Sequence, residues 1–281
     1  CADLALADAY HLPAAEVTRL HALVASAHLR FYRRMQVSWA DIARMVLEDV
    51  PARLYGDGCL RVAMAAFFGV FLASMLLGAW NPQLAEAFVG AEDLASLRDM
   101  YASSPTGRDS DTGTGMSGFY IFHNVGIALS CFASGVFAGI GSLVWLVFNG
   151  LYLGLCFGFM AMVEDPTRAH FFEFTAAHGP FELTGIMLSG AAGLRMGLGM
   201  ILTNGLPRME SLRRSAADAF PIMAVAAVLV AMAAPIEAFV SPSSLPLGVK
   251  RAVGMICACV VLMYLVGLGR FGHRRASSVT P

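Results

Sequence analysis

Six apolar stretches, each close to the length that crosses a lipid bilayer, constrain this sequence more than any other feature. They cover approximately residues 59–80, 119–140, 143–163, 181–203, 220–240 and 251–269. The hydrocarbon core of a bilayer is spanned by a helix of about 20 apolar residues. Because lipid offers no hydrogen-bond partners, each stretch is expected to cross as a helix that satisfies its own backbone groups. We therefore predict an all-α, polytopic membrane protein with six transmembrane helices.

The composition agrees with this class and argues against one kind of partner. Of the 281 residues, 57% are hydrophobic and 14% are charged, whereas soluble domains carry about 25% charged residues. The formal net charge is −1, and the sequence has no dense basic tract. We therefore expect no nucleic-acid binding, and the lipid bilayer is the first partner that the sequence predicts.

The segments outside the spans suggest a simple domain organisation. We predict amphipathic helices at residues 1–58, in the cytoplasm or at the membrane surface, followed by a six-span domain at residues 59–270. Residues 271–281 would form a cytoplasmic tail. The polar loop at 81–118 is expected to be helical in its first half, and its Ser/Thr/Gly/Asp-rich end, residues 103–118, to be flexible.

The front segment has the pattern of two helices. Apolar residues recur at helical spacing between Pro13 and Arg34, with basic residues on the opposite face. A second helix is expected to begin at Ser38, with Asp41 completing a variant of the capping box, and to run to about Leu54 with a kink near Asp49. These helices either rest on the membrane surface or dock a partner protein, and the two roles are compatible.

The basic residues predict the orientation. There are 19 Lys and Arg residues in all, and most of them lie on the side of the membrane that holds the N-terminus, while Arg195 lies within a span. Short loops on the cytoplasmic side carry the excess of basic residues. Both termini are therefore predicted to be cytoplasmic. The basic residues left on the outer side are Arg98, Arg108, Arg168, Lys250 and Arg251.

This orientation places several polar residues at a similar depth near the outer surface. His123 and Asn124 begin span two, His178 and Glu182 begin span four, and Glu237 ends span five. His178 and Glu182 are four residues apart, so they share one face of a continuous helix. An ionisable side chain costs about 2.5–3.5 kcal/mol at mid-membrane on insertion scales, so each of these residues is a candidate for function.

Two interpretations of this polar layer remain open. His178, Glu182 and His123 could bind zinc, since imidazole and carboxylate are ordinary zinc ligands and three of them leave a position for water. The residues could instead form a hydrogen-bonded cluster that fixes the helix ends, in which case no cofactor is expected. Asn149 and Arg195 lie toward the inner side, where we expect hydrogen bonds between helices. A transport role for Arg195 is the alternative, although no carboxylate partner is identified from the sequence.

Glycine residues repeat at four-residue spacing in three of the spans. Small residues at this spacing let helix backbones approach closely, and such packing drives helix association in lipid. We predict that spans two, three and four form a glycine-packed core, while the same faces could also serve a homodimer. The residues are Gly135, Gly139, Gly150, Gly154, Gly158, Gly193 and Gly197.

The order of these motifs resembles the stage II sporulation protein M family. The resemblance rests on His123-Asn124, Gly135 to Gly141, Asn149-Gly150 to Gly154, His178-Gly179 with Glu182-Leu183, and Gly190 to Arg195. It implies a multi-pass protein of the bacterial inner membrane without known enzymatic activity. It also implies a scaffold that recruits partner proteins of the cell envelope, and a sporulation role is not carried over with it. The alternative is a transporter or a metal-dependent membrane enzyme that uses the outward His/Glu layer.

Overall fold

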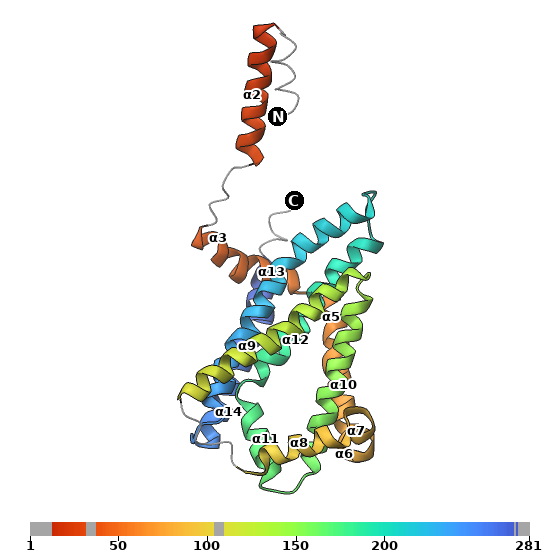
Figure 1. Ribbon diagram of the computed structural model, residues 1–281, viewed down its shortest axis with the longest axis vertical. Coiled ribbons are helices and arrows are strands. Elements are labelled where there is room, and N and C mark those ends of the chain that lie inside the picture. The colour runs from red at the N-terminus through yellow and green to blue at the C-terminus, as the bar shows by residue number, and fades with distance from the viewer. Residues whose placement is uncertain (1–12, 32–37, 104–109, 273, 275–281) are drawn as a thin grey trace. The chain divides into compact units, whose positions relative to one another are not determined.

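The computed structural model describes residues 13–31, 38–103, 110–272 and 274, and the remaining residues lie outside the description. The chain divides into two compact units, residues 1–42 and 43–281. Within the described residues the secondary structure is helical, without strands (Figure 1). This result confirms the all-α class.

The first unit contains the predicted front helix and the start of the next one. Helix α2 covers Ala14–Phe31, and α3 covers Trp39–Arg44. The predicted capping box is present before α3. The Ser38 backbone N–H donates to Asp41 Oδ2 at 3.0 Å, and the Asp41 N–H donates to Ser38 Oγ at 3.1 Å. These two bonds satisfy backbone donors that the first turn of a helix leaves open.

Among its described residues, the second unit holds six helices that are long and apolar enough to cross a membrane, so the polytopic architecture is confirmed. The candidate spans are Gly58–Trp80, Thr114–Val136, Ile140–Met162, Gly179–Ile201, Arg208–Val240 and Leu247–Gly272. Several of them combine α-helix with short π- or 3-10-helical segments. The elements are η1 (Met45–Asp49), α4 (Val50–Leu54), α5 (Gly58–Met64), η2 (Ala65–Gly69), α6 (Val70–Trp80), α7 (Pro82–Val89), α8 (Ala91–Ala102), α9 (Ser110–Ala133), η3 (Ser134–Val136), α10 (Ile140–Met162), α11 (Thr167–Ala176), α12 (Gly179–Ile201), α13 (Arg208–Pro235), η4 (Ile236–Val240), α14 (Leu247–Leu262) and η5 (Met263–Leu268).

Helix α12, the fourth span, is the centre of this unit. Its most apolar window is 72% buried, against 22–44% for the other five spans. It packs against α5, α9, α10, α13 and α14. Small side chains make this possible, because Gly185, Ser189, Gly190 and Gly193 are all buried on it and let neighbours approach from several sides. Helix α12 runs unbroken for 23 residues, about 34 Å at 1.5 Å per residue, so it is long enough to cross the bilayer completely.

The glycine faces form direct backbone contacts between spans. A Cβ atom on Gly197 would overlap the backbone nitrogen of Gly139, and one on Gly135 would overlap the backbone of Gly193. Spans two and four therefore meet as predicted. The glycine face of span three has a further partner, since a Cβ on Gly150 would lie 2.6 Å from the carbonyl oxygen of Phe67 in span one. The glycine-packed core thus extends beyond spans two to four to include span one.

Three shorter helices gather at one end of the second unit (Figure 1). Helix α8 contacts both α7 and α11, and all three contact α10. Together α7, α8 and α11 are called the helical platform here. Tyr101 of α8 is buried against Phe171 and Phe174 of α11, with ring centroids 5.3 and 5.6 Å apart. His170 Nδ1 also lies 2.9 Å from the carbonyl oxygen of Tyr101.

The platform confirms the expected helical first half of the loop after span one. The expected flexibility of the second half is wrong for residues 110–118, because α9 already begins at Ser110. Residues 104–109 lie outside the described part of the chain. The predicted cytoplasmic tail also falls largely outside it, at residues 273 and 275–281.

The second unit begins earlier than the predicted boundary at residue 58. Val50 and Leu54 are buried, and the hydroxyl of Tyr264 in η5 donates to the carbonyl oxygen of Val46 at 2.8 Å. The chain from Met45 to Leu54 therefore packs against span six instead of lying apart from the bundle. The kink predicted near Asp49 stays a prediction; at this place the π-helical segment η1 ends at Asp49, and Pro51 follows in the first turn of α4.

Candidate functional site

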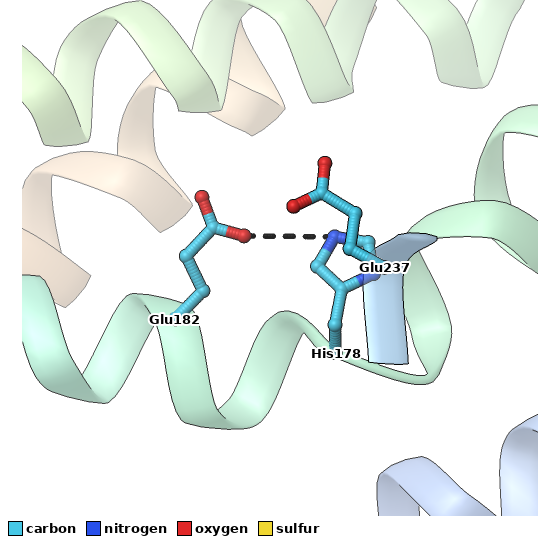
Figure 2. A group of neighbouring side chains, drawn as sticks. All are labelled: His178, Glu182 and Glu237. Atoms are coloured by element: carbon cyan, nitrogen blue, oxygen red, sulfur yellow. Dashed lines mark ion pairs between the residues drawn. The ribbon is translucent and has the colours of Figure 1, made fainter. Parts of the chain in front are cut away.

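One histidine and two glutamates of the predicted polar layer converge at the start of span four and the end of span five. His178 is the N-cap of α12 and Glu182 lies in its first turn, while Glu237 belongs to η4. One potential ligand atom from each residue lies within 4.8 Å of the other two. Figure 2 shows His178 and Glu182 rising from neighbouring turns of α12, with Glu237 reaching toward them from η4.

The local sequence explains why these side chains meet. Pro180 occupies the first turn of α12, where its missing N–H leaves no helical bond unmade, so the helix begins directly after His178. The four-residue separation then places Glu182 one turn further on the same face. Pro235 precedes the π-helical segment Ile236–Val240, and π-helical turns are frequent at functional sites. This segment carries Glu237 and ends directly before Ser241, and both residues lie close to α12.

The cluster is buried and closely spaced. His178 is 5% exposed and Glu237 is 9% exposed, whereas the side chain of Glu182 is 20% exposed and lies at the edge of the cluster. One carboxylate oxygen of Glu237 is sealed from solvent. His178 Nε2 lies 3.5 Å from Glu182 Oε2 (Figure 2). This separation is longer than the usual 2.7–3.2 Å of a hydrogen bond between nitrogen and oxygen.

The second ring nitrogen of His178 is held by a residue that the sequence analysis did not single out. His178 Nδ1 and Ser241 Oγ lie 3.0 Å apart, and Ser241 is fully buried. This bond fixes the orientation of the ring and leaves Nε2 facing the carboxylates. His178 precedes the first residue of span four, and burial lowers the pKa of its imidazole to about 4.

His123 and Asn124 do not join the group of three. The side chain of His123 is exposed, and its ring stacks on Phe119 with centroids 5.7 Å apart. Asn124 is buried on the adjacent position of α9, a helix that packs against η4. The predicted layer thus separates into a buried cluster and an exposed histidine, because equal depth does not fix the direction of a side chain around its helix.

Asn149 and Arg195 lie apart from this cluster. The side-chain amide of Asn149 donates to the carbonyl oxygen of Trp145 at 2.8 Å, a bond within its own helix instead of the expected bond between helices. Arg195 forms an ion pair with Asp57, whose side chain is 9% exposed. Asp57 also caps α5, because its Oδ1 accepts from the Leu60 N–H at 3.0 Å. Its place directly before an apolar stretch, as an N-cap residue, was the signal that could have identified it.

The Arg195–Asp57 pair borders a cavity of about 630 Å³. Elements from four parts of the second unit line it: the start of α5, the turn after span two, the end of α12 and the start of α13. Gly139, Ser215 and Asp218 are among the lining residues. The cavity combines one cationic and two anionic side chains with an apolar wall.

A comparison with protein families identifies the family of this chain. The family model described as "Stage II sporulation protein M" matches residues 64–242, which is well over half of the chain. The chain belongs to the stage II sporulation protein M family. The matched range contains all four residues of the buried site, His178, Glu182, Glu237 and Ser241, whereas Asp57 lies outside it. We found no match among curated proteins or among solved structures.

In this family member the side chains of the cluster are best suited to binding a divalent metal ion. One imidazole nitrogen and two carboxylates are the donor types that hold zinc and related divalent ions, and three protein ligands leave a further position for water. The same groups could also serve as a hydrogen-bonded link between two helices. Either way, the cluster ties the beginning of span four to the end of span five.

Proposed function

We propose that this protein is a non-enzymatic integral membrane scaffold that organises or recruits other proteins of the cell envelope. It would lie in the bacterial inner membrane with both termini in the cytoplasm. Membership of the stage II sporulation protein M family and the six candidate spans support the membrane location. The uneven distribution of Lys and Arg supports the orientation.

The observation that carries the proposal is the helical platform outside the spans. Helices α7, α8 and α11 pack onto α10, where Leu94 and Tyr101 are buried in two apolar clusters that include Leu155 and Met160 of that span. On its surface the platform exposes apolar side chains such as Leu84 and Met100, which are 45% and 59% exposed. An ordered surface of this kind, held on a membrane anchor, is what a recruiting protein must present.

The way in which the spans pack supports a static role for the bundle. The glycine contacts between spans one and three, and between spans two and four, leave no space for a Cβ atom. Sliding or rotation of these helices would break backbone-to-backbone contacts along several turns. A bundle packed in this manner holds the platform in a fixed position.

Photo-crosslinking in the native bacterium tests the scaffold directly. A photoreactive residue replaces Leu84 or Met100 on the platform, and a matched control replaces Leu76, which is 71% exposed on the apolar surface of span one. We expect the platform positions to form adducts with a defined envelope protein, and the control position to form adducts with lipid. Platform adducts with nothing but lipid or a second copy of the chain would overturn the proposal.

A transporter or a metal-dependent membrane enzyme is the second candidate. The specific observation in its favour is the convergence of His178, Glu182 and Glu237. The two candidates differ in what a conservative substitution does. If the protein is a scaffold, Glu182→Gln leaves the platform adducts unchanged, whereas an enzyme or transporter loses its turnover with this carboxylate. A transport role for Arg195 is a separate prediction. In that role the cavity beside Arg195 would hold the transported substrate.

A further inference from the structure

We infer that His178, Glu182 and Glu237 bind a divalent metal ion with the ligand preferences of zinc, and that this ion links the start of α12 to η4. The inference goes beyond the proposed scaffold function and does not depend on it. Imidazole nitrogen and carboxylate oxygen are ordinary zinc ligands. The three residues lie at the beginning of span four and the end of span five, so the ion would join elements that are distant in sequence.

The distance between the His178 and Glu182 donors fits a shared metal ion better than a direct hydrogen bond. His178 Nε2 and Glu182 Oε2 are 3.5 Å apart, and all three donors lie within 4.8 Å of one another. Ligands at 2.0–2.2 Å from a tetrahedral zinc ion are separated from each other by roughly 3.3–3.6 Å. The His178–Glu182 distance therefore equals one edge of such a tetrahedron, whereas it is long for a hydrogen bond.

The histidine is already oriented as a ligand by a second residue. Histidines that bind metals almost always use the other ring nitrogen in a hydrogen bond, which sets the tautomer and the ring orientation. Here Ser241 Oγ lies 3.0 Å from His178 Nδ1, so Nε2 is the nitrogen that faces the two carboxylates. Ser241 itself is fully buried, and it follows directly after the segment that carries Glu237.

Burial of the two carboxylates explains why a bound cation would be energetically favourable. Two carboxylates brought together in a buried site repel each other and lose their hydration. A divalent cation would offset both effects at once, since its charge matches that of the two ionised carboxylates. The backbone also positions the ligands. The π-helical segment η4 carries Glu237 and Ser241 follows it directly, so both residues lie on the same side of α12.

Metal analysis of the full-length protein in detergent tests the inference. The protein is stripped with a chelator, loaded with zinc, freed of excess metal and assayed for bound zinc and thermal stability. We expect about one zinc per chain and a higher melting temperature after loading. Glu182→Gln and Glu237→Gln should each remove the bound zinc and the shift. Ser241→Ala should weaken zinc affinity about 10- to 100-fold, since it removes the bond that orients the ligand.

Glu173→Gln is the matched control. Glu173 lies on α11, close in sequence to the cluster but not part of the group of three, so this variant should bind zinc like the wild type. Circular dichroism and gel filtration establish that each variant is folded. Wild-type protein that is folded but binds no zinc and shows no shift would overturn the inference, as would folded glutamine variants that retain full zinc binding.

A measurement on the wild type alone guards against variants that fail to fold. Cobalt(II) takes up zinc sites and absorbs visible light with an intensity that reports its coordination geometry. We expect the stripped wild-type protein to acquire an absorption band typical of four or five ligands, and zinc to displace it. A spectrum identical to that of hydrated cobalt would contradict the site.

Discussion

The ion pair between Arg195 and Asp57 depends on a residue, Asp57, that the sequence analysis did not identify. Arg195 stood out because it lies within an apolar span, but its partner sits at the very start of another span, 138 positions away. Asp57 has two roles, since one oxygen caps α5 and the other accepts from Arg195. A depth argument could place several carboxylates near Arg195, and only the fold selects among them.

A double-mutant cycle measures the strength of this pair. Asp57→Asn retains a good N-cap residue while removing the charge, and Arg195→Gln removes the other charge. We expect the two substitutions to be coupled by about 1–2 kcal/mol in the free energy of unfolding. The value is moderate because the Arg195 side chain is 34% exposed, and solvent screens such a pair. Unfolding in mixed detergent provides the measurement.

The exposed pair of Glu210 and Arg214 serves as the control for that cycle. Their side chains are 43% and 64% exposed, with Arg214 Nε 3.0 Å from Glu210 Oε1. Pairs of this kind on a helix surface contribute about 0.3–0.5 kcal/mol. Equal coupling energies for the two pairs would show that the Arg195–Asp57 contact contributes no more than a surface contact.

The buried cluster could be predicted only in part, because depth in the membrane does not determine the direction in which a side chain points around its helix. The four-residue spacing of His178 and Glu182 predicts their contact, because both lie on one helix face. Glu237 could be assigned to the same depth but not to the same side of the bundle. His123 was assigned to the same depth, yet its side chain is exposed and lies outside the cluster. Ser241 carried no signal, since a serine in a Ser/Pro-rich turn is common without any site.

At the scale of helices, apolar length predicts the spans well and glycine spacing predicts their contacts poorly. A bilayer fixes the length of a crossing helix, so the six spans follow from the sequence alone. A small-residue face shows that some helix approaches closely, without showing which one. Gly150, Gly154 and Gly158 of α10 accordingly face η2 and α6 of span one, a pairing that the sequence leaves open.

A methyl group at the contact between spans two and four tests the packing. Gly197→Ala places a Cβ atom on the backbone of Gly139, and overpacking of this kind costs up to about 3 kcal/mol. We expect a clear loss of thermal stability in detergent. Gly126→Ala on α9 is the control, because nothing lies within 4 Å of its added Cβ and alanine favours a helix over glycine by about 1 kcal/mol. Equal melting temperatures for the two variants would contradict the close contact.

For the whole molecule, the location of the cluster and the platform depends on the orientation of the bundle. The second unit places the platform at one end, and the unequal distribution of basic residues predicts that this end faces the outside. If the bundle were reversed, the platform would face the cytoplasm and recruit partners there. The proposed role in the cell envelope and the route by which a metal reaches His178 both follow from this orientation.

Cysteine labelling in intact spheroplasts is the most direct test of this central claim. Met100→Cys places a thiol on the platform and Met209→Cys places one at the start of α13, at positions that are 59% and 72% exposed. Wild-type protein, with its native cysteines, provides the blank. With a membrane-impermeant thiol reagent, we expect Met100→Cys to be labelled in intact cells and Met209→Cys to be labelled only after permeabilisation. The reverse pattern would contradict the predicted orientation.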